Sequence, residues 1–217
     1  MRSKFDEQLQ VLHTQLIEMG GLCESAIASA VKGLLEGDRH QAKKAIEYDE
    51  QVDRMERDIE TLCLKLLLQQ QPVARDLRQI SAALKMITDM ERIGDQCADI
   101  AEITRLDNVR ADDEKFSIRE MAMAVIKMVT DSVDAYVRQD LDLAHAVIGA
   151  DDEVDRYFDE VKNQLAQLLG KDAERAEYVI DLLMITKYLE RIGDHATNIA
   201  EWVVFSITGR HEEEEEC

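Results

Sequence analysis

Apolar residues recur at spacings of three and four along most of the chain, which is the periodicity of amphipathic helices. The pattern predicts six helices. Five of them cover residues 3–36, 38–70, 117–138, 140–170 and 173–208. The remaining helix, third along the chain, starts between residues 73 and 76 and runs to 106. Each helix has one apolar stripe and a charged opposite face, so each has one face to bury. We therefore expect an all-α fold.

Capping signals mark where these helices should begin and end. Glycines that suit C-terminal stops are Gly37, Gly170 and Gly209. Asp38 and Asp140 suit N-caps, and Ser117 opens an S-x-x-E capping box. Residues 107–116 are polar and show no periodicity, so we place a boundary between two halves of the chain there.

Two motifs recur and indicate an internal duplication. Glu-Arg-Ile-Gly-Asp occurs at 91–95 and at 190–194, and 190 − 91 = 99. Residues 49–54 (DEQVDR) match residues 151–156 (DDEVDR), and 151 − 49 = 102. With short connections between helices, the duplication predicts two tandem antiparallel three-helix bundles, at 1–107 and 108–210, and a disordered acidic tail at 211–217.

Charge and cysteine usage narrow the functional classes. A formal net charge of −20 repels phosphate backbones and anionic lipid, which argues against direct binding to nucleic acid or a membrane. The chain shows neither a signal-peptide pattern nor an apolar run long enough to span a bilayer. The four cysteines, Cys23, Cys63, Cys97 and Cys217, show no spacing typical of a metal site or a disulfide framework. We expect a cytoplasmic protein with reduced core thiols.

The repeated motifs place carboxylates four residues apart, on one face of a helix. The first set is Asp49, Asp53, Glu91, Asp95 and Asp99, and the second is Asp151, Asp155, Glu190, Asp194 and the neutral Asn198. On a helical wheel these stripes lie away from the apolar arc, so we expect them at the surface. Oxygen ligands on neighbouring helices suit hard or borderline cations such as Mg, Ca, Mn or Fe. The alternative is that they are ordinary solvated helix faces.

Glycine inside a helix is unfavourable, so Gly94 and Gly193 within the repeated motif need a reason. They serve either a metal site or the close packing of another helix, and the sequence does not choose between these. His195 has Gln96 as its counterpart, so we expect it to take no part in the repeated motif. No E-x-x-H spacing, phosphate-cradling glycine loop or nucleophile elbow occurs, which argues against an enzyme.

Residues 71–80 (QPVARDLRQI), followed by ERIGD at 91–95, resemble the first-half signature of the PhoU family, and the resemblance spans nearly the whole chain. It implies two tandem three-helix bundles and a cytoplasmic, non-enzymatic negative regulator of phosphate uptake and of the phosphate regulon. Its implied partners are the ATPase subunit of a phosphate ABC transporter and a phosphate-responsive sensor histidine kinase.

The resemblance also implies metal on paired E/D-x-x-x-D motifs, multinuclear iron in some members, with Zn, Mn or Mg as alternatives. Those motifs fall on Asp49, Asp53, Glu91, Asp95, Asp151, Asp155, Glu190 and Asp194. Asp99 extends the first set, and the neutral Asn198 makes the second set the weaker one. Two rival functions remain open, a metal-dependent hydrolase or oxidase and a metal-free helical adapter. Methionine-bearing faces on long bundles favour a homodimer.

Overall fold

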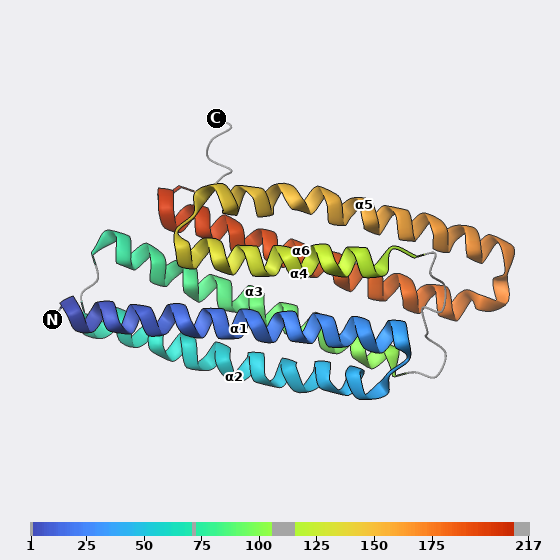
Figure 1. The fold of residues 1–217 in the computed structure, drawn as a ribbon, viewed down its shortest axis with the longest axis horizontal. Helices are drawn as coiled ribbons and strands as arrows, with labels where there is room; N and C mark the ends of the chain where they lie inside the picture. The colour runs from blue at the N-terminus through green and yellow to red at the C-terminus, as the bar shows by residue number, and fades with distance from the viewer. Residues whose placement is uncertain (1, 71–72, 106–115, 211–217) are drawn as a thin grey trace.

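The structure, a computed structural model, describes residues 2–70, 73–105 and 116–210. Its helices are α1 (Arg2–Glu36), α2 (Arg39–Gln70), α3 (Ala74–Thr104), α4 (Ile118–Arg138), α5 (Leu141–Lys171) and α6 (Ala176–Thr208), with a 3₁₀ turn η1 (Ala173–Arg175) before α6 (Figure 1). No strand occurs in these ranges. The predicted all-α fold is confirmed.

Two of the three predicted N-caps are confirmed. The Asp38 carboxylate accepts hydrogen bonds from two amides in the first turn of α2, the shorter at 2.9 Å. Asp140 accepts one from the first turn of α5 at 3.0 Å. The capping box at Ser117 is wrong, because that hydroxyl donates to Glu160 of α5 at 3.3 Å and makes no cap hydrogen bond.

Two of the three predicted glycine stops are confirmed by left-handed backbone angles. Gly37 has φ of 64° and Gly209 has φ of 78°, in the region that glycine adopts most easily. Gly170 is not a stop, since α5 runs on to Lys171. The turn there is made by Asp172, whose extended backbone ends α5. Its carboxylate accepts a hydrogen bond from the backbone amide of Glu174 in η1 at 3.2 Å.

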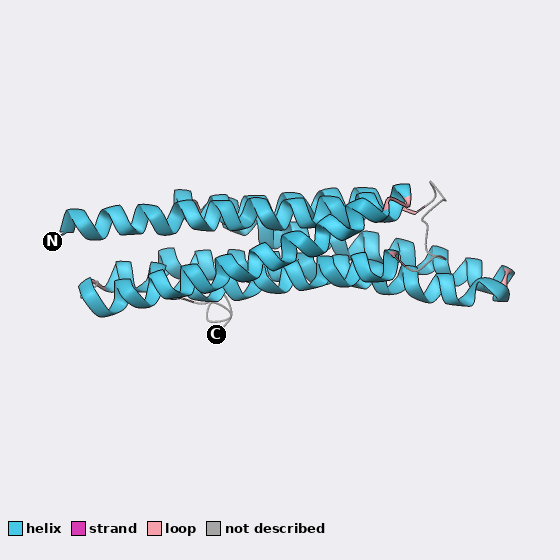
Figure 2. Cartoon of the chain, turned by 90° about the horizontal axis from the view of Figure 1, so that it is seen from below, coloured by secondary structure: helices cyan, strands magenta, loops and turns pink. Residues whose placement is uncertain are grey.

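The helices form two sets of three that lie along a common long axis (Figures 1 and 2). Helices α1, α2 and α3 pack together, as do α4, α5 and α6. The two sets meet where α3 packs against α6 and α1 against α4. The helices that carry the ERIGD motifs, α3 and α6, therefore lie side by side at the middle of the molecule.

The contact between α1 and α4 is close and partly polar. A Cβ on Gly20 would lie 3.2 Å from a methyl carbon of Val133, so the glycine permits the approach. The buried Tyr136 hydroxyl donates to the Gln79 carbonyl at 2.8 Å, and its ring meets the His13 ring edge-on with centroids 5.6 Å apart. Buried side chains from all six helices form one connected core.

Several sequence predictions fall outside the described residues. These are the boundary at 107–108, the end of the third helix at 106, the acidic tail and Cys217. The division into two units at that boundary stays a prediction. The three described cysteines, Cys23, Cys63 and Cys97, are buried free thiols, as predicted. None of the described helices combines the length and apolarity that crossing a bilayer requires.

Candidate metal centres

The first cluster of carboxylates lies between α2 and α3. Asp49 and Asp53 come from α2, and Glu91 and Asp95 come from α3. The other three acids act electrostatically on Asp49, so the structure brings all four together. We call them the first acid cluster.

The expectation that these acids face outward holds only in part. The Asp95 side chain is 41% exposed, but Glu91 is only 23% exposed. One Asp49 oxygen, Oδ1, is buried and has no hydrogen-bond partner. The cluster is therefore sunk between two helices, with its innermost oxygen out of contact with water.

Gly94 makes this placement of Asp49 possible. A Cβ at Gly94 would lie 2.7 Å from Asp49 Oδ1 and 3.4 Å from a methyl carbon of Val52. The sequence left two explanations for this glycine open, a metal site and the close packing of another helix, and the contact at this position is compatible with both. The glycine lets α2 pack closely, and the group that α2 brings to that spot is a carboxylate.

The acids in the first cluster hold their protons more tightly than free carboxylic acids do. Burial, followed by the charges of Asp53, Asp95 and Glu91, raises the pKa of Asp49 to about 6. Burial and Asp95 also raise the pKa of Glu91, against the opposing effect of Arg92. A proton or a bound cation would relieve the repulsion that both shifts report.

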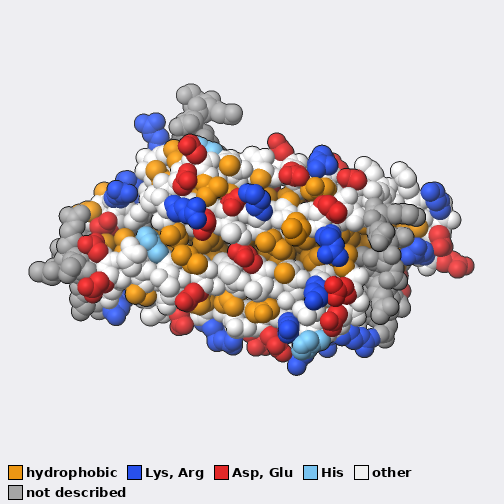
Figure 3. Space-filling view, viewed as in Figure 1, with side chains coloured by type: hydrophobic (Ala, Val, Ile, Leu, Met, Phe, Trp, Pro, Cys, Tyr) orange, Lys and Arg blue, Asp and Glu red, His pale blue; other side chains and the backbone are white. Residues whose placement is uncertain are grey.

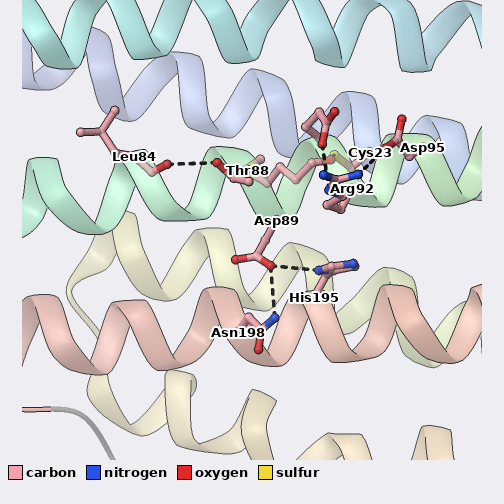
Figure 4. Close-up of polar contacts among 10 residues, drawn as sticks. Cys23, Leu84, Thr88, Asp89, Arg92, Asp95, His195 and Asn198 are labelled. Atoms are coloured by element: carbon pink, nitrogen blue, oxygen red, sulfur yellow. Dashed lines mark hydrogen bonds and ion pairs between the residues drawn. The ribbon is translucent and has the colours of Figure 1, made fainter.

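Arginine side chains supply the positive charge at this cluster. Arg92 lies 3.5 Å from a Glu91 oxygen and 3.3 Å from an Asp95 oxygen (Figure 4). Arg57 lies 3.2 Å from an Asp53 oxygen. Across the described ranges, no three His, Cys, Asp or Glu side chains converge in a way that could hold a metal ion. A metal ion here would require the Asp53, Glu91 and Asp95 side chains to turn away from the arginines.

The second acid cluster repeats the arrangement between α5 and α6. Asp155, Asp194 and Glu190 act on Asp151, and after burial their charges raise its pKa to about 6. A Cβ at Gly193 would lie 3.2 Å from a methyl carbon of Val154 and 3.5 Å from Asp151 Oδ1. The helices therefore pack closely here too, but the aspartate oxygen lies farther from the glycine than in the first cluster.

Two neighbours distinguish the second cluster from the first. Lys187 forms an ion pair with Glu190, and the same lysine opposes the rise that burial and Glu190 cause in the pKa of Asp194. The Thr197 hydroxyl lies near Asp151 and favours its ionised form, which lowers the pKa. The first half has Ala98 at the equivalent position, since 197 − 98 = 99, so Asp49 lacks such a neighbour.

Asp99 and Asn198 make contacts where α3 packs against α6. The Tyr188 hydroxyl lies near Asp99 and opposes the rise in its pKa, and Asn198 donates a hydrogen bond to Asp89 at 3.2 Å (Figure 4). These two contacts are related by the duplication, because 188 − 89 = 99 and 198 − 99 = 99. Both side chains thus join the halves. Asp99 also stays within electrostatic reach of the first acid cluster, because burial, followed by the charges of Glu102 and Asp95, raises its pKa.

Sequence reasoning missed Asp89 and Tyr188, and it gave His195 no role. His195 Nδ1 lies 2.9 Å from Asp89 Oδ1, so Asp89 joins two side chains of α6 (Figure 4). Asp89 and Tyr188 occupy equivalent positions in the two repeats, which was the available signal. That signal marks a shared position, but it does not tell which helix the position faces.

The chemistry of the acid clusters fits a hard cation. Every donor is a carboxylate oxygen, the ligand type that Mg²⁺, Mn²⁺ and iron accept. The Asp49 Oδ1 atom supplies the specific fit, because a buried carboxylate oxygen without a partner is unfavourable unless a proton or cation joins it.

The chain is similar to known proteins along almost its whole length. The family model described as PhoU domain matches residues 16–104 and 118–203. The phosphate-specific transport system accessory protein PhoU homolog of Clostridium acetobutylicum is 37% identical over 211 residues, which is 96% of each chain. The homolog of Pseudomonas aeruginosa is 35% identical over 208 residues, which is 95% of this chain and 86% of the other.

Solved structures agree with the sequence relatives. The crystal structure of PhoU from Pseudomonas aeruginosa matches with a TM-score of 0.89 and 34% identity, covering 95% of this chain and 100% of that one. The phosphate transport system regulatory protein PhoU from Streptococcus pneumoniae matches with a TM-score of 0.86 and 25% identity, covering 95% and 98%. With both repeats matched and the fold shared throughout, the chain belongs to the PhoU family.

Proposed function

We propose that this protein is an accessory regulator of a phosphate-specific transport system. The support is that relatives bearing that name align with 95% or more of the chain, and that the shared fold includes both repeats. In this role the protein is not an enzyme. It lowers phosphate uptake and phosphate-regulon expression when phosphate is plentiful, by docking in the cytoplasm, as a homodimer, on the transporter's ATPase subunit and on a sensor histidine kinase.

The proposed regulator carries metal on its two acid clusters. The observation that supports this most directly is the buried, unpaired Asp49 Oδ1 among three further acids. The ligands are Asp49, Asp53, Glu91 and Asp95 in the first cluster and Asp151, Asp155, Glu190 and Asp194 in the second. The metal, iron with Zn, Mn or Mg as alternatives, supplies positive charge. The residues of this chain provide the oxygen donors and hold each helix pair in register.

The regulatory role is tested by crosslinking in living cells grown with high and with low phosphate. We expect the transporter's ATPase subunit and the histidine kinase to be captured with this protein when phosphate is high. Deleting the protein should raise expression of a phosphate-regulon reporter in the same medium. Capture of neither partner, together with an unchanged reporter, contradicts the proposal.

The metal site is tested by elemental analysis of protein purified without chelator or an affinity metal. We expect bound metal in the parent and its loss in Asp95→Asn with Asp194→Asn. The matched control is Asp134→Asn with Asp159→Asn, which removes the same charge from acids paired with Arg138 and Lys162 outside the clusters. Equal metal content in the two double variants counts against the acid clusters.

Activity assays separate the regulator from the catalytic alternative. Phosphatase and peroxidase turnover should be absent from the metal-loaded parent protein. Turnover that is present in the parent, lost in the cluster variant and kept in the control variant would favour an enzyme instead.

A further inference from the structure

Basic side chains gather at the end of the first bundle where α2 begins and α3 ends. A cavity of about 530 Å³ there is lined, among the described residues, by Arg39, Lys43, Glu102 and Arg105. Arg39 and Lys43 are four residues apart, so they lie on the same face of α2, about 6 Å apart along the helix. Arg105 reaches the cavity from the C-cap position of α3. Figure 3 shows Lys and Arg side chains over this end of α2.

The positive charge of this cavity is absent from the duplicated position. At the offsets of 102 and 99 residues, the three basic residues correspond to Leu141, His145 and Val204, whereas the acid is kept as Glu201. Val204 is buried in the core of the second half. The basic lining is thus not repeated at the equivalent residues of the second half, and the duplicated fold does not require it.

The charge balance of the lining favours a small anion with two or more negative charges. Among the described residues of the lining, three basic groups and one acid give 3 − 1 = +2. Glu47 lies 3.4 Å from Lys43 and offsets part of its charge, whereas the N-terminal end of α2 adds positive potential. Asp38 already accepts hydrogen bonds from the first amides of α2, so a ligand would meet side chains there and not the helix backbone.

The rest of the molecule limits the size of that anion. A long polyanion such as nucleic acid would extend beyond the cavity, where the negative surface of a protein with net charge −20 repels it. A compact anion feels mainly the local groups. Arginine guanidinium groups bind phosphoryl oxygens in a bidentate manner, and the two arginines lie on different helices, so one multivalent ligand can contact both.

We propose that the cavity between the start of α2 and the end of α3 binds a compact phosphoanion, either orthophosphate or a short chain of phosphoryl groups. Arg39 and Arg105 bind phosphoryl oxygens from two sides, and Lys43 adds a third contact. Glu102 offsets part of this attraction, and the positive charge that remains attracts a multiply charged anion more strongly than a singly charged one. The site lies on the same two helices as the first acid cluster, with Lys43 six residues before Asp49 (49 − 43 = 6) and Glu102 seven residues after Asp95 (102 − 95 = 7). It does not depend on the proposed regulatory function.

The experiment is a set of calorimetric titrations of the full chain after chelator treatment, with orthophosphate, pyrophosphate and tripolyphosphate as separate probes. We expect saturable binding at one site per chain that strengthens with ligand charge and weakens as salt is added. Arg105→Ala and Lys43→Ala should each weaken pyrophosphate binding about tenfold, as expected for loss of one charge-assisted contact. Arg138→Ala, which removes the same charge at the end of α4, should bind as the parent does.

Two results would overturn the proposal. They are no saturable binding of any of the three probes, and equal binding of pyrophosphate by Arg105→Ala and Arg138→Ala. The cluster variant Asp95→Asn with Asp194→Asn should bind pyrophosphate normally, and loss of binding there would assign the ligand to the acid clusters instead. All these measurements use the isolated protein, so their failure leaves the partner crosslinking test of the regulator unaffected.

Discussion

Replacing Asp49 and Asp151 by asparagine should stabilise the chelator-treated protein at neutral pH. Both carboxyl groups have a pKa raised from 3.8 to about 6, first by burial and then by neighbouring acids. A group whose pKa is higher in the folded chain binds protons more tightly there. Its contribution to stability is therefore present below about pH 4 and is lost as the pH rises through 6.

The size of this effect follows from the two pKa values. A tenfold change in proton affinity corresponds to about 1.4 kcal/mol, so a rise from 3.8 to about 6 sets a ceiling of about 3 kcal/mol per site. Both side chains are only partly buried, and screening by water and salt reduces the effect to about 1 kcal/mol each. For a chain of this length, about 2 kcal/mol in total should raise the melting temperature by about 5 °C.

The assay is denaturant unfolding of the parent and the double variant in chelator at pH 4, 5, 6 and 7.5. The stability gained by the variant should be small at pH 4, grow towards pH 6 and stay constant above it. Added metal should then stabilise the parent and not the variant, because only the parent keeps both innermost acids. A variant that is no more stable than the parent at pH 7.5 in chelator would refute the reasoning.

Three further substitutions test the packing around these sites. Gly94→Ala should change the unfolding free energy by less than about 1 kcal/mol, because the better helix propensity of alanine offsets the crowding of Asp49. The same variant should retain less metal in elemental analysis. Unchanged metal retention would contradict the close approach of Asp49 to Gly94. Tyr136→Phe should destabilise the protein by about 1 kcal/mol in denaturant unfolding through loss of its bond to the Gln79 carbonyl, and no loss would mean that the bond adds nothing. Asp140→Ala should lower the unfolding free energy by about 1 kcal/mol through loss of the α5 N-cap, and a neutral result would contradict that cap.

The sequence by itself determined the helices and the duplication. Apolar residues recur over 20 or more positions in each segment, and such a long pattern leaves little freedom in where a helix lies. The bounds are least certain where a single residue decides them, as at Gly170, because glycine is tolerated inside a helix when nothing forces the left-handed conformation. The pairing of Asp49 and Asp53 with Glu91 and Asp95 also followed, since α2 and α3 are consecutive antiparallel helices.

Only the tertiary structure decided which neighbour meets each side of the acidic stripe. Asp95 and Asp99 are four residues apart and share one face of α3, yet Asp95 lies with α2 and Asp99 contacts Tyr188 of α6. Ser117 likewise meets α5 where the local pattern predicted a cap. The spacing of apolar residues shows which face of one helix is buried, because residues three and four apart lie on the same face. Which helices cover the remaining directions depends on how two halves of one core pack together, and no local pattern contains that information.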